Sequence, residues 1–324
     1  MSSATTFAVA ATFAVAAAFA YVLARRRRSS HKTGPLTIVK FGGSAITTKA
    51  KFETLDTAAL MAAARDVARS SGSRFVLMHG AGSFGHFQAR EFGVSKGTVD
   101  PSFSWRGFAE TRASVSKLNG LVVGALLREG VDAVAVPPFP RWLTAAKVPD
   151  AQAAAVGVRE LQRILQVGLT PVLHGDAVLD EVNGSAILSG DTLMVHLAST
   201  LAPSLAVFLT DVAGVFTCPP SEPNATLLTS IRVSSSGAIV SSQAAVASKV
   251  SSAGGTECSA AGLAPTTSTA AHDVTGGLAA KLKAAAAIAA AGTRVIIVQV
   301  GTEHAAAALR GEVPQVCTVI ELDR

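Results

Sequence analysis

The sequence has few cysteines and few aromatic side chains. Its 324 residues include only three cysteines, Cys218, Cys258 and Cys317, which are far apart and form no CxxC pair. This excludes a disulfide framework and a zinc knuckle, and it favours a reducing compartment. Aromatic residues make up 5% of the chain against 49% hydrophobic residues overall. The chain can therefore bury a globular core built largely from Ala, Val and Leu.

The net charge outside the first 34 residues is also small. The formal net charge is +6, and the first 34 residues contain five basic side chains and no acidic one. Since five of the six excess charges lie there, the rest of the chain carries a net charge of only +1. A nucleic-acid-binding surface is therefore not expected, and we predict no nucleic-acid partner.

A run of twenty uncharged residues, 5–24, precedes four arginines at positions 25–28. As a helix this run extends about 30 Å, the thickness of the apolar part of a bilayer. Positive charge directly after it predicts a membrane anchor whose following residues, the catalytic body, are cytoplasmic. A disordered or organelle-targeting leader is the alternative; a cleaved secretory peptide normally has its basic residues first. We assign residues 1–34 to this leader and residues 35–324 to one catalytic domain.

The stretch LMHGAGSFGH, residues 77–86, has the composition of a phosphate-binding turn. A run of apolar β-formers ends in a turn with glycines at 80, 82 and 85, where backbone amides can approach a ligand without intervening side chains. The stretch closes on His86, whose imidazole can donate a hydrogen bond to a phosphate oxygen or carry a proton near neutral pH. An ordinary strand-to-helix turn with a satisfied histidine is the alternative for this segment taken alone.

A second glycine turn follows the first predicted strand. Lys40 lies at the end of this buried strand and is followed by Gly42, Gly43 and Ser44. Open α/β sheets place ligand-binding groups at this edge, where glycines let phosphates lie against the backbone and an ammonium supplies a point charge. Lys49 follows as a second cation. A solvated loop position is the alternative for either lysine.

Helical and strand patterns alternate along the chain, which favours an α/β protein. Helices are expected over residues 55–69, 103–129, 156–167 and 304–309. Strands are expected over residues 36–41, 74–78, 131–136, 170–174, 204–210, 294–300 and 316–322. Residues 233–271 are rich in Ser, Ala and Gly, so we expect a mobile insertion there rather than core.

Three later segments carry polar groups suited to phosphates or to lysines. Gly190 opens a predicted helix, and Asp191 near its start either caps the helix or holds two catalytic lysines at the right separation. TDVAGV, residues 210–215, follows a strand, as a nucleotide-binding wall would. In DVTGGLAAK, residues 273–281, two glycines introduce a helix with Lys281 in its first turns, again a phosphate-binding geometry.

Three large aromatic residues, Trp105, Phe108 and Trp142, lie in or near the helix expected over residues 103–129. They can line an apolar pocket for a substrate. Packing in the hydrophobic core is the alternative and the commoner role of such side chains.

These motifs, in this order, resemble the isopentenyl phosphate kinase branch of the amino acid kinase superfamily. The resemblance covers residues 36–324 through VKFGGSAITTK, HGAGSFGH, GFAETRASVSKLN, ILSGD, TDVAGV and DVTGGLAAK. It implies a three-layer α-β-α sandwich with a mostly parallel central sheet. In this fold residues from about 35 to 200 would bind the phosphate acceptor, and residues from about 201 to 324 would bind ATP. It further implies a homodimer that uses ATP to phosphorylate an isoprenoid monophosphate, isopentenyl phosphate, to isopentenyl diphosphate for isoprenoid biosynthesis.

Carried over by position, the resemblance assigns five catalytic residues: Lys40, Lys49, His86, Asp191 and Lys281. Lys40 and Lys49 would contact the transferring phosphoryl group, with Lys49 stabilising its charge in the transition state. His86 would bind the acceptor phosphate, and Asp191 would orient the lysines. The acceptor pocket would be shaped by Gly80, Ala81, Gly85 and Gly190 together with His86. ATP would be bound by Lys40, Gly42, Gly43, Ser44, Gly82, Thr210, Asp211, Gly214, Gly277 and Lys281. Mg²⁺ would bridge ATP oxygens, and no metal-binding residue is assigned because no carboxylate cluster forms a dedicated cage.

The sequence departs from the pattern of this branch at Thr192, Ala213 and Leu278, where Asp, Asp and Met are usual. These positions flank the functional ones, so they bear on nucleotide affinity more than on the reaction. A kinase for another small phosphate or phosphonate, of the fosfomycin-kinase kind, is the first alternative function. A membrane-tethered binding module without catalysis is the second, and the joint retention of the five catalytic residues argues against it.

Overall fold

The computed structural model describes residues 34–70, 72–245 and 277–324. In chain order its elements are β1 (Leu36–Phe41), α2 (Gly43–Ile46), α3 (Thr57–Arg69), β2 (Arg74–His79), the 3₁₀ turn η1 (Gly82–Phe84), α4 (His86–Glu91), α5 (Trp105–Arg128), β3 (Ala133–Ala135), β4 (Thr144–Ala145), β5 (Val148–Pro149), α6 (Ala151–Gln166), β6 (Thr170–His174), β7 (Asp176–Asp180), β8 (Gly184–Leu188), α7 (Gly190–Leu201), β9 (Leu205–Thr210), β10 (Val215–Phe216), β11 (Leu227–Val233), β12 (Ile239–Ala244), α8 (Gly277–Ala290), β13 (Arg294–Gln299), α9 (Glu303–Leu309) and β14 (Thr318–Leu322). The membrane anchor expected at residues 5–24 lies outside the described residues. Within the described ranges, no helix is long and apolar enough to cross a bilayer.

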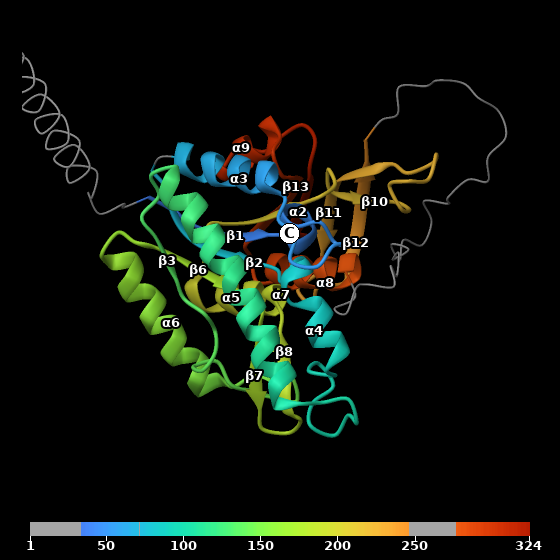
Figure 1. Cartoon of the computed structure of the whole chain (residues 1–324). Helices are drawn as coiled ribbons and strands as arrows, with labels where there is room; N and C mark the ends of the chain where they lie inside the picture. The colour runs from blue at the N-terminus through green and yellow to red at the C-terminus, as the bar shows by residue number, and fades with distance from the viewer. Residues whose placement is uncertain (1–33, 71, 246–276) are drawn as a thin grey trace, which may run out of the picture.

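A ten-stranded sheet forms the centre of the molecule (Figure 1), in the order β10-β11-β14-β13-β9-β1-β2-β6-β3, with β12 paired to β11. The six neighbours from β13 to β3 run parallel. Antiparallel pairs occur only toward the other edge of the described sheet, where β14, β10 and β12 join it. Strands β1 and β9 are buried along their whole length, as expected for strands covered on both faces. The mostly parallel sheet expected from the sequence is confirmed.

Two hydrophobic clusters lie on opposite faces of this sheet. Because side chains alternate along a strand, Leu36 and Ile38 of β1 belong to one cluster, whereas Val39 and Phe41 belong to the other. Residues of α6, α7 and α8 complete the first cluster, and residues of α3, α5 and α9 complete the second. The molecule is therefore the expected three-layer α-β-α sandwich, and Lys40 projects from β1 on the side of α7 and α8.

Polar caps set the starts of the helices more sharply than the apolar pattern does. The carboxylate of Asp150 accepts a hydrogen bond of 2.8 Å from the backbone amide of Ala153. The helix α6 therefore begins at Ala151 rather than at the expected residue 156. Asp56 caps α3 in the same way through the amide of Ala59, at 2.9 Å. The remaining expected helices and strands are present, with ends that differ by a few residues.

A second, four-stranded sheet in the order β5-β4-β7-β8 was not expected from the sequence. Strands β7 and β8 form an antiparallel hairpin directly after β6. Its turn ends at Asn183, and Gly184, the first residue of β8, has a positive φ of 73°. Asn-Gly at this place is a typical hairpin signal. The hairpin lies below the central sheet in the view of Figure 1.

The expectation of a mobile insertion rather than core over residues 233–271 is wrong at its start. Residues 239–244 form β12, which pairs antiparallel with β11, and Val233 is a buried residue of β11. The side chains of β12 are mostly exposed, which explains why their Ser-rich and Ala-rich composition does not look like a strand of the core. Residues 246–271 lie outside the described part of the chain.

Candidate active site

Lys40 and Asp191 form a largely buried ion pair at the carboxyl end of β1. Lys40 Nζ lies 2.8 Å from Asp191 Oδ1, and the two side chains are only 7% and 15% exposed. The ammonium also lies 5.9 Å from the centre of the Phe208 ring. The N-terminal cap of α7 is Ser189, whose hydroxyl accepts a hydrogen bond of 3.1 Å from the amide of Thr192. Asp191 is thus not needed as the helix cap, and its carboxylate is turned to the lysine.

Gly190 allows this pair to form. A Cβ atom at position 190 would lie 2.9 Å from Lys40 Cε, so a larger residue would push the lysine away from α7. Gly175, directly after β6, is also close to α7, because a Cβ there would lie 3.2 Å from the amide nitrogen of Gly190. The first turn of α7 is therefore packed directly against the ends of β1 and β6.

Lys49 and Asp211 form a second, more exposed pair. Lys49 Nζ lies 3.5 Å from Asp211 Oδ2, and the side chains are 61% and 40% exposed. Burial acts to raise the pKa of Asp211, but the charges of Lys49 and Lys281 and a hydrogen bond from Ser44 lower it overall. The carboxylate of Asp211 is therefore charged at neutral pH and faces two cations.

Lys281, in the second turn of α8, is the third lysine of this cluster. Burial, and next the positive charge of Lys40, lower its pKa to about 8, against the opposing effect of Asp191 and Asp211. Three ammonium groups and two carboxylates from five segments of the chain thus lie near one another, and their charges shift the pKa values of Asp211 and Lys281. Such an arrangement is suited to binding a ligand with several anionic oxygens.

The two glycine turns predicted from the sequence touch each other. A Cβ atom on Gly43 would lie 2.5 Å from the amide nitrogen of Gly82, and one on Gly80 would lie 2.9 Å from that of Gly43. The amides of Gly42 and Gly80 donate to Leu209 O and Phe41 O, so these two residues hold the strand ends. Gly43 and Ser44 begin α2, and their amides have no acceptor within that helix.

Thr210 and Gly214 have packing roles in this structure. The hydroxyl of Thr210 lies 2.6 Å from Val212 O and 3.3 Å from Val298 O, so its proton is used inside the protein. A Cβ atom on Gly214 would lie 2.4 Å from Thr318 Oγ1, which itself donates to Leu228 O. Their contact with ATP stays a prediction, as does that of Gly277, the first residue of α8.

His86 is the half-buried first residue of α4. Gly85, directly before it, is buried, and a Cβ atom there would lie 3.0 Å from Ala81 Cβ and 3.7 Å from Val115 Cβ of α5. The turn that carries His86 is therefore packed onto α5. Binding of the acceptor phosphate by His86 stays a prediction.

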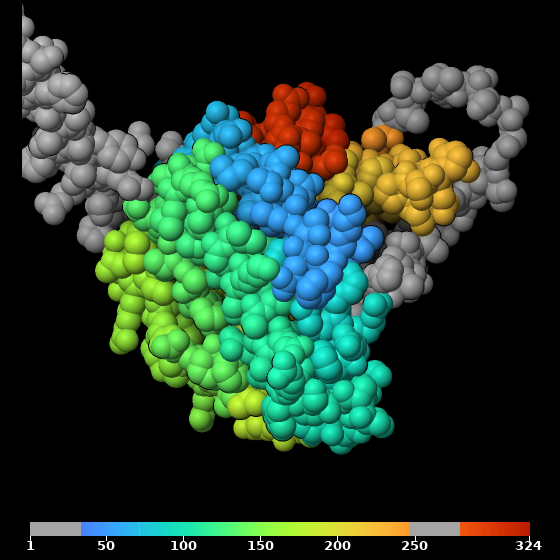
Figure 2. Space-filling view, viewed as in Figure 1, coloured from blue at the N-terminus to red at the C-terminus, as the bar shows by residue number. Residues whose placement is uncertain are grey.

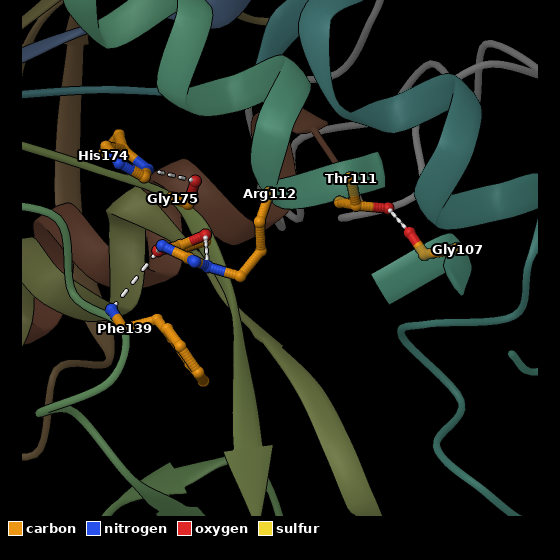
Figure 3. Close-up of polar contacts among 7 residues, drawn as sticks. Gly107, Thr111, Arg112, Phe139, His174 and Gly175 are labelled. Atoms are coloured by element: carbon orange, nitrogen blue, oxygen red, sulfur yellow. Dashed lines mark hydrogen bonds and ion pairs between the residues drawn. The ribbon is translucent and has the colours of Figure 1, made fainter. Parts of the chain in front are cut away.

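A polar cluster beside this turn was missed by the sequence analysis. Arg112 of α5 donates two hydrogen bonds of 3.2 Å to Asp176, and its guanidinium lies 4.2 Å from the centre of the Phe139 ring. Figure 3 shows Arg112 reaching down from its helix toward Phe139, with His174 and Gly175 alongside. The amide of Phe139 also donates to Asp176. Burial raises the pKa of Asp176, although His174 and Arg112 oppose this effect.

Two buried histidines close the ends of adjacent strands. His79 and His174 are register partners in β2 and β6, and their rings stack at 5.5 Å. Burial and the neighbouring His174 lower the pKa of His79 to about 3, so its ring is neutral. Its Nδ1 donates to Gly80 O, and its Nε2 accepts from Asn119. The repeated His-Gly at two strand ends, residues 79–80 and 174–175, is a signal that could have identified this pair.

The three aromatic residues considered as pocket walls separate into two groups. Trp142 is buried in the core cluster of α6, where a Cβ atom on Gly157 would lie 2.6 Å from its Nε1. Trp105 and Phe108 belong instead to a chain of edge-to-face contacts that ends on Phe139. Only this second group reaches Phe139, the ring that Arg112 contacts.

Comparison with known proteins shows which family this chain resembles. The model of the amino acid kinase family matches residues 35–299. An isopentenyl phosphate kinase of Arabidopsis thaliana is 41% identical over 252 residues, which are 76% of this chain and 70% of the relative. One from Methanothermobacter thermautotrophicus is 36% identical over 202 residues, 60% of this chain and 74% of the relative. A solved isopentenyl phosphate kinase structure superposes with a TM-score of 0.67 at 28% identity, covering 88% of this chain and 99% of that one.

Proposed function

Because this chain belongs to the amino acid kinase family, we propose that it transfers the γ-phosphoryl group of ATP to isopentenyl phosphate, forming isopentenyl diphosphate. The observation that carries this proposal is the cluster of Lys40, Lys49 and Lys281 held by two aspartates beside paired glycine turns. The likeness to isopentenyl phosphate kinases over most of the chain supports the choice of acceptor.

The proposed reaction needs positioning and neutralisation of charge rather than covalent help. An oxygen of the acceptor phosphate attacks the γ-phosphorus of ATP, and the bond from that phosphorus to the β-phosphate oxygen breaks, which leaves ADP. Lys40 and Lys49 stabilise the negative charge on the transferring group, and Lys281 binds ATP oxygens. Asp191 keeps Lys40 in place, since a buried ammonium without a partner would be displaced or lose its proton.

The remaining predicted contacts follow the two halves of the site. We propose that His86, Gly80, Ala81, Gly85 and Gly190 surround the acceptor phosphate. ATP lies against Gly42, Gly43, Ser44, Gly82, Thr210, Asp211, Gly214 and Gly277. The aromatic residues Trp105 and Phe108 lie on the side where the hydrocarbon part of the acceptor would extend.

We propose that Mg²⁺ enters with ATP and is held mainly by phosphate oxygens. No group of three or more His, Cys, Asp or Glu in the described ranges could hold a metal ion by itself. In kinases Mg²⁺ is usually bound through one or two carboxylates and the substrate phosphates. Asp211, the more exposed of the two site carboxylates, is the residue best suited to assist.

The resemblance supports a homodimer, and the uncharged run at residues 5–24 supports a membrane tether with a cytoplasmic catalytic domain. Both are proposals. Sedimentation of the purified chain tests the first, and fractionation of cells expressing the chain with and without residues 1–34 tests the second.

A coupled assay of ADP release over a small panel of acceptors tests the proposed reaction. The panel contains isopentenyl phosphate, dimethylallyl phosphate, glycerol 3-phosphate and fosfomycin. We expect the highest kcat/KM with isopentenyl phosphate. A preference for fosfomycin or glycerol 3-phosphate would favour the alternative kinase, and ADP release with no member of the panel would favour a binding module.

His86→Ala is expected to raise KM for isopentenyl phosphate and to lower kcat/KM about tenfold or more, the usual effect of losing a hydrogen bond to a charged group. KM for ATP should stay within about twofold, since the residue is assigned to the acceptor alone. Steady-state kinetics with each substrate varied in turn measures both constants. His86→Gln, which keeps a hydrogen-bond donor, should recover part of the loss; wild-type kinetics in His86→Ala would remove this residue from the site.

The pKa of Lys281, lowered to about 8, predicts a pH dependence of ATP use. Below this pH the ammonium is charged and binds ATP oxygens; above it the charge is lost. We therefore expect kcat/KM for ATP to be constant near pH 7 and to fall as pH rises through about 8, since this constant reports groups of the free enzyme. In Lys281→Arg the fall should disappear, because guanidinium stays charged. The same fall in both proteins would assign it to another group.

A further inference from the structure

Glu53 has an unusual backbone conformation in the loop that carries Lys49. Its φ is 44°, in the left-handed region that residues other than glycine, asparagine and aspartate rarely adopt. The loop between α2 and α3 is closed at its base, where the amide of Thr48 donates to Thr54 O at 2.9 Å. Residues held in such conformations persist where surrounding contacts determine them, and they are frequent at functional sites.

The contacts that hold Glu53 come from two other segments of the chain. Its amide donates to Ser83 O, in the glycine turn, at 3.0 Å. Its carboxylate accepts hydrogen bonds from Ser114 Oγ at 2.7 Å and from Lys117 Nζ at 2.5 Å, both on α5. Burial acts to raise the pKa of Glu53, but the bonds from Lys117 and Ser114 lower it overall. The carboxylate is therefore charged at neutral pH and bound on both oxygens.

Neighbouring residues attach the same loop to the glycine turn. Thr54 N donates to Ser83 Oγ at 3.1 Å, and Ser83 N donates to Thr47 Oγ1 at 3.0 Å. The ring of Phe52 packs edge to face on Phe87, the residue after His86, with centroids 5.9 Å apart. In Figure 2 the blue surface of this part of the chain borders the green surface of α5.

Lys49 itself has little to hold it. Its side chain is 61% exposed, and the charged partner that the structure gives it, Asp211, lies 3.5 Å away. Exposed ion pairs of this kind restrain a side chain weakly. The place of the Lys49 ammonium over the site is therefore set mainly by the conformation of its loop.

We propose that Glu53 is a positioning residue that joins the Lys49 loop to α5 and to the glycine turn, so that Lys49 and His86 face the same phosphoryl group. This inference rests on the proposed function, in which Lys49 stabilises the transferring group. A glycine at position 53 would accept the backbone conformation more easily, but it could not make the bonds to Ser114 and Lys117. Placement of the loop by the side chain thus explains why position 53 is a glutamate, although glycine would suit the backbone conformation better.

Glu53→Gly tests the inference, because it relieves the backbone and removes the clamp. Relief of the backbone offsets part of the lost hydrogen bonds, so we expect a Tm close to that of the wild type, together with a kcat about 10-fold to 100-fold lower, the range expected for a misplaced catalytic group. KM for ATP should change little. Lys117→Met breaks the same contact from the other side, and adding it to Glu53→Gly should cause no further loss. Lys51→Ala, an exposed lysine of the same loop, is the matched control and should leave kcat unchanged.

Two results would overturn the inference. One is a wild-type kcat in Glu53→Gly. The other is a parallel loss of Tm and kcat in both Glu53→Gly and Glu53→Gln, which would indicate a purely structural anchor. Failure of the proposed function is separate, because it would show as absent transfer to isopentenyl phosphate in the wild-type protein, or as a Lys49→Ala variant as active as the wild type.

Discussion

Replacing Lys49 with alanine is expected to lower kcat on the order of 10²-fold or more while leaving the fold unchanged. Removing one preorganised group that stabilises developing charge has this effect in enzymes. Stability should hardly change, because the side chain is 61% exposed and exposed ion pairs contribute at most about 1 kcal/mol. Steady-state kinetics and thermal unfolding of the same preparation measure the two quantities. A large loss of kcat at constant Tm would separate chemistry from folding.

Two further variants sharpen this experiment. Lys51→Ala removes an exposed lysine two positions further along the same loop and should retain full activity. Lys49→Arg keeps the charge but changes its shape and reach, so kcat should lie between those of the wild type and the alanine variant. If Lys49→Ala raised only KM for ATP, the residue would bind ground-state nucleotide rather than stabilise the transition state.

The central layer of this fold could be predicted from the sequence because its strands are buried on both faces. The segments that became β1, β2, β6, β9 and β13 are short, continuous apolar runs that end in glycine or a polar turn. The place of Lys40 at the carboxyl end of a central strand could be predicted for the same reason, since Lys40 is the polar residue near the end of such a run. Its pairing with Asp191, which is 151 positions away, followed from the resemblance and from charge complementarity.

Contacts between distant polar residues were beyond this kind of prediction. Asp176 and Arg112 are 64 positions apart, and neither lies in a motif that marks an ion pair. Glu53 and Lys117 are equally far apart, and the positive φ of Glu53 cannot be read from a residue that rarely adopts it. Such pairs depend on how α5 packs across the strand ends, which no local pattern encodes.

Composition does not indicate a strand where that strand lies at an exposed edge. The residues of β12 are small and mostly polar, so they lack the apolar run by which the central strands were identified. The strand exists because its backbone pairs with β11, and this pairing leaves no mark on the side chains. Thr210 and Gly214 illustrate the converse: both lie in a recognised motif, yet their contacts here are with Val212, Val298 and Thr318.

Asp191→Asn is expected to impair both stability and catalysis, unlike Lys49→Ala. Lys40 and Asp191 are nearly buried, and removing one partner of a buried pair typically lowers the free energy of unfolding by about 3–5 kcal/mol. The unpaired Lys40 ammonium would then repel Lys281 and leave its place beside α7. With both lysines misplaced, kcat should fall on the order of 10²-fold or more. Denaturant unfolding and steady-state kinetics measure the two losses.

The same variant makes a prediction about charge that a simple loss of stability would not. The carboxylate of Asp191 raises the pKa of Lys281, which stands at about 8 in the intact site. Without that charge the pKa of Lys281 falls, so the decline of kcat/KM for ATP should begin at a lower pH than in the wild type. Glu160→Gln, which breaks the exposed pair of Glu160 with Arg141, is the control and should cost at most about 1 kcal/mol without moving the pH profile. An unshifted profile in Asp191→Asn would mean that Asp191 does not set the charge of the lysine cluster.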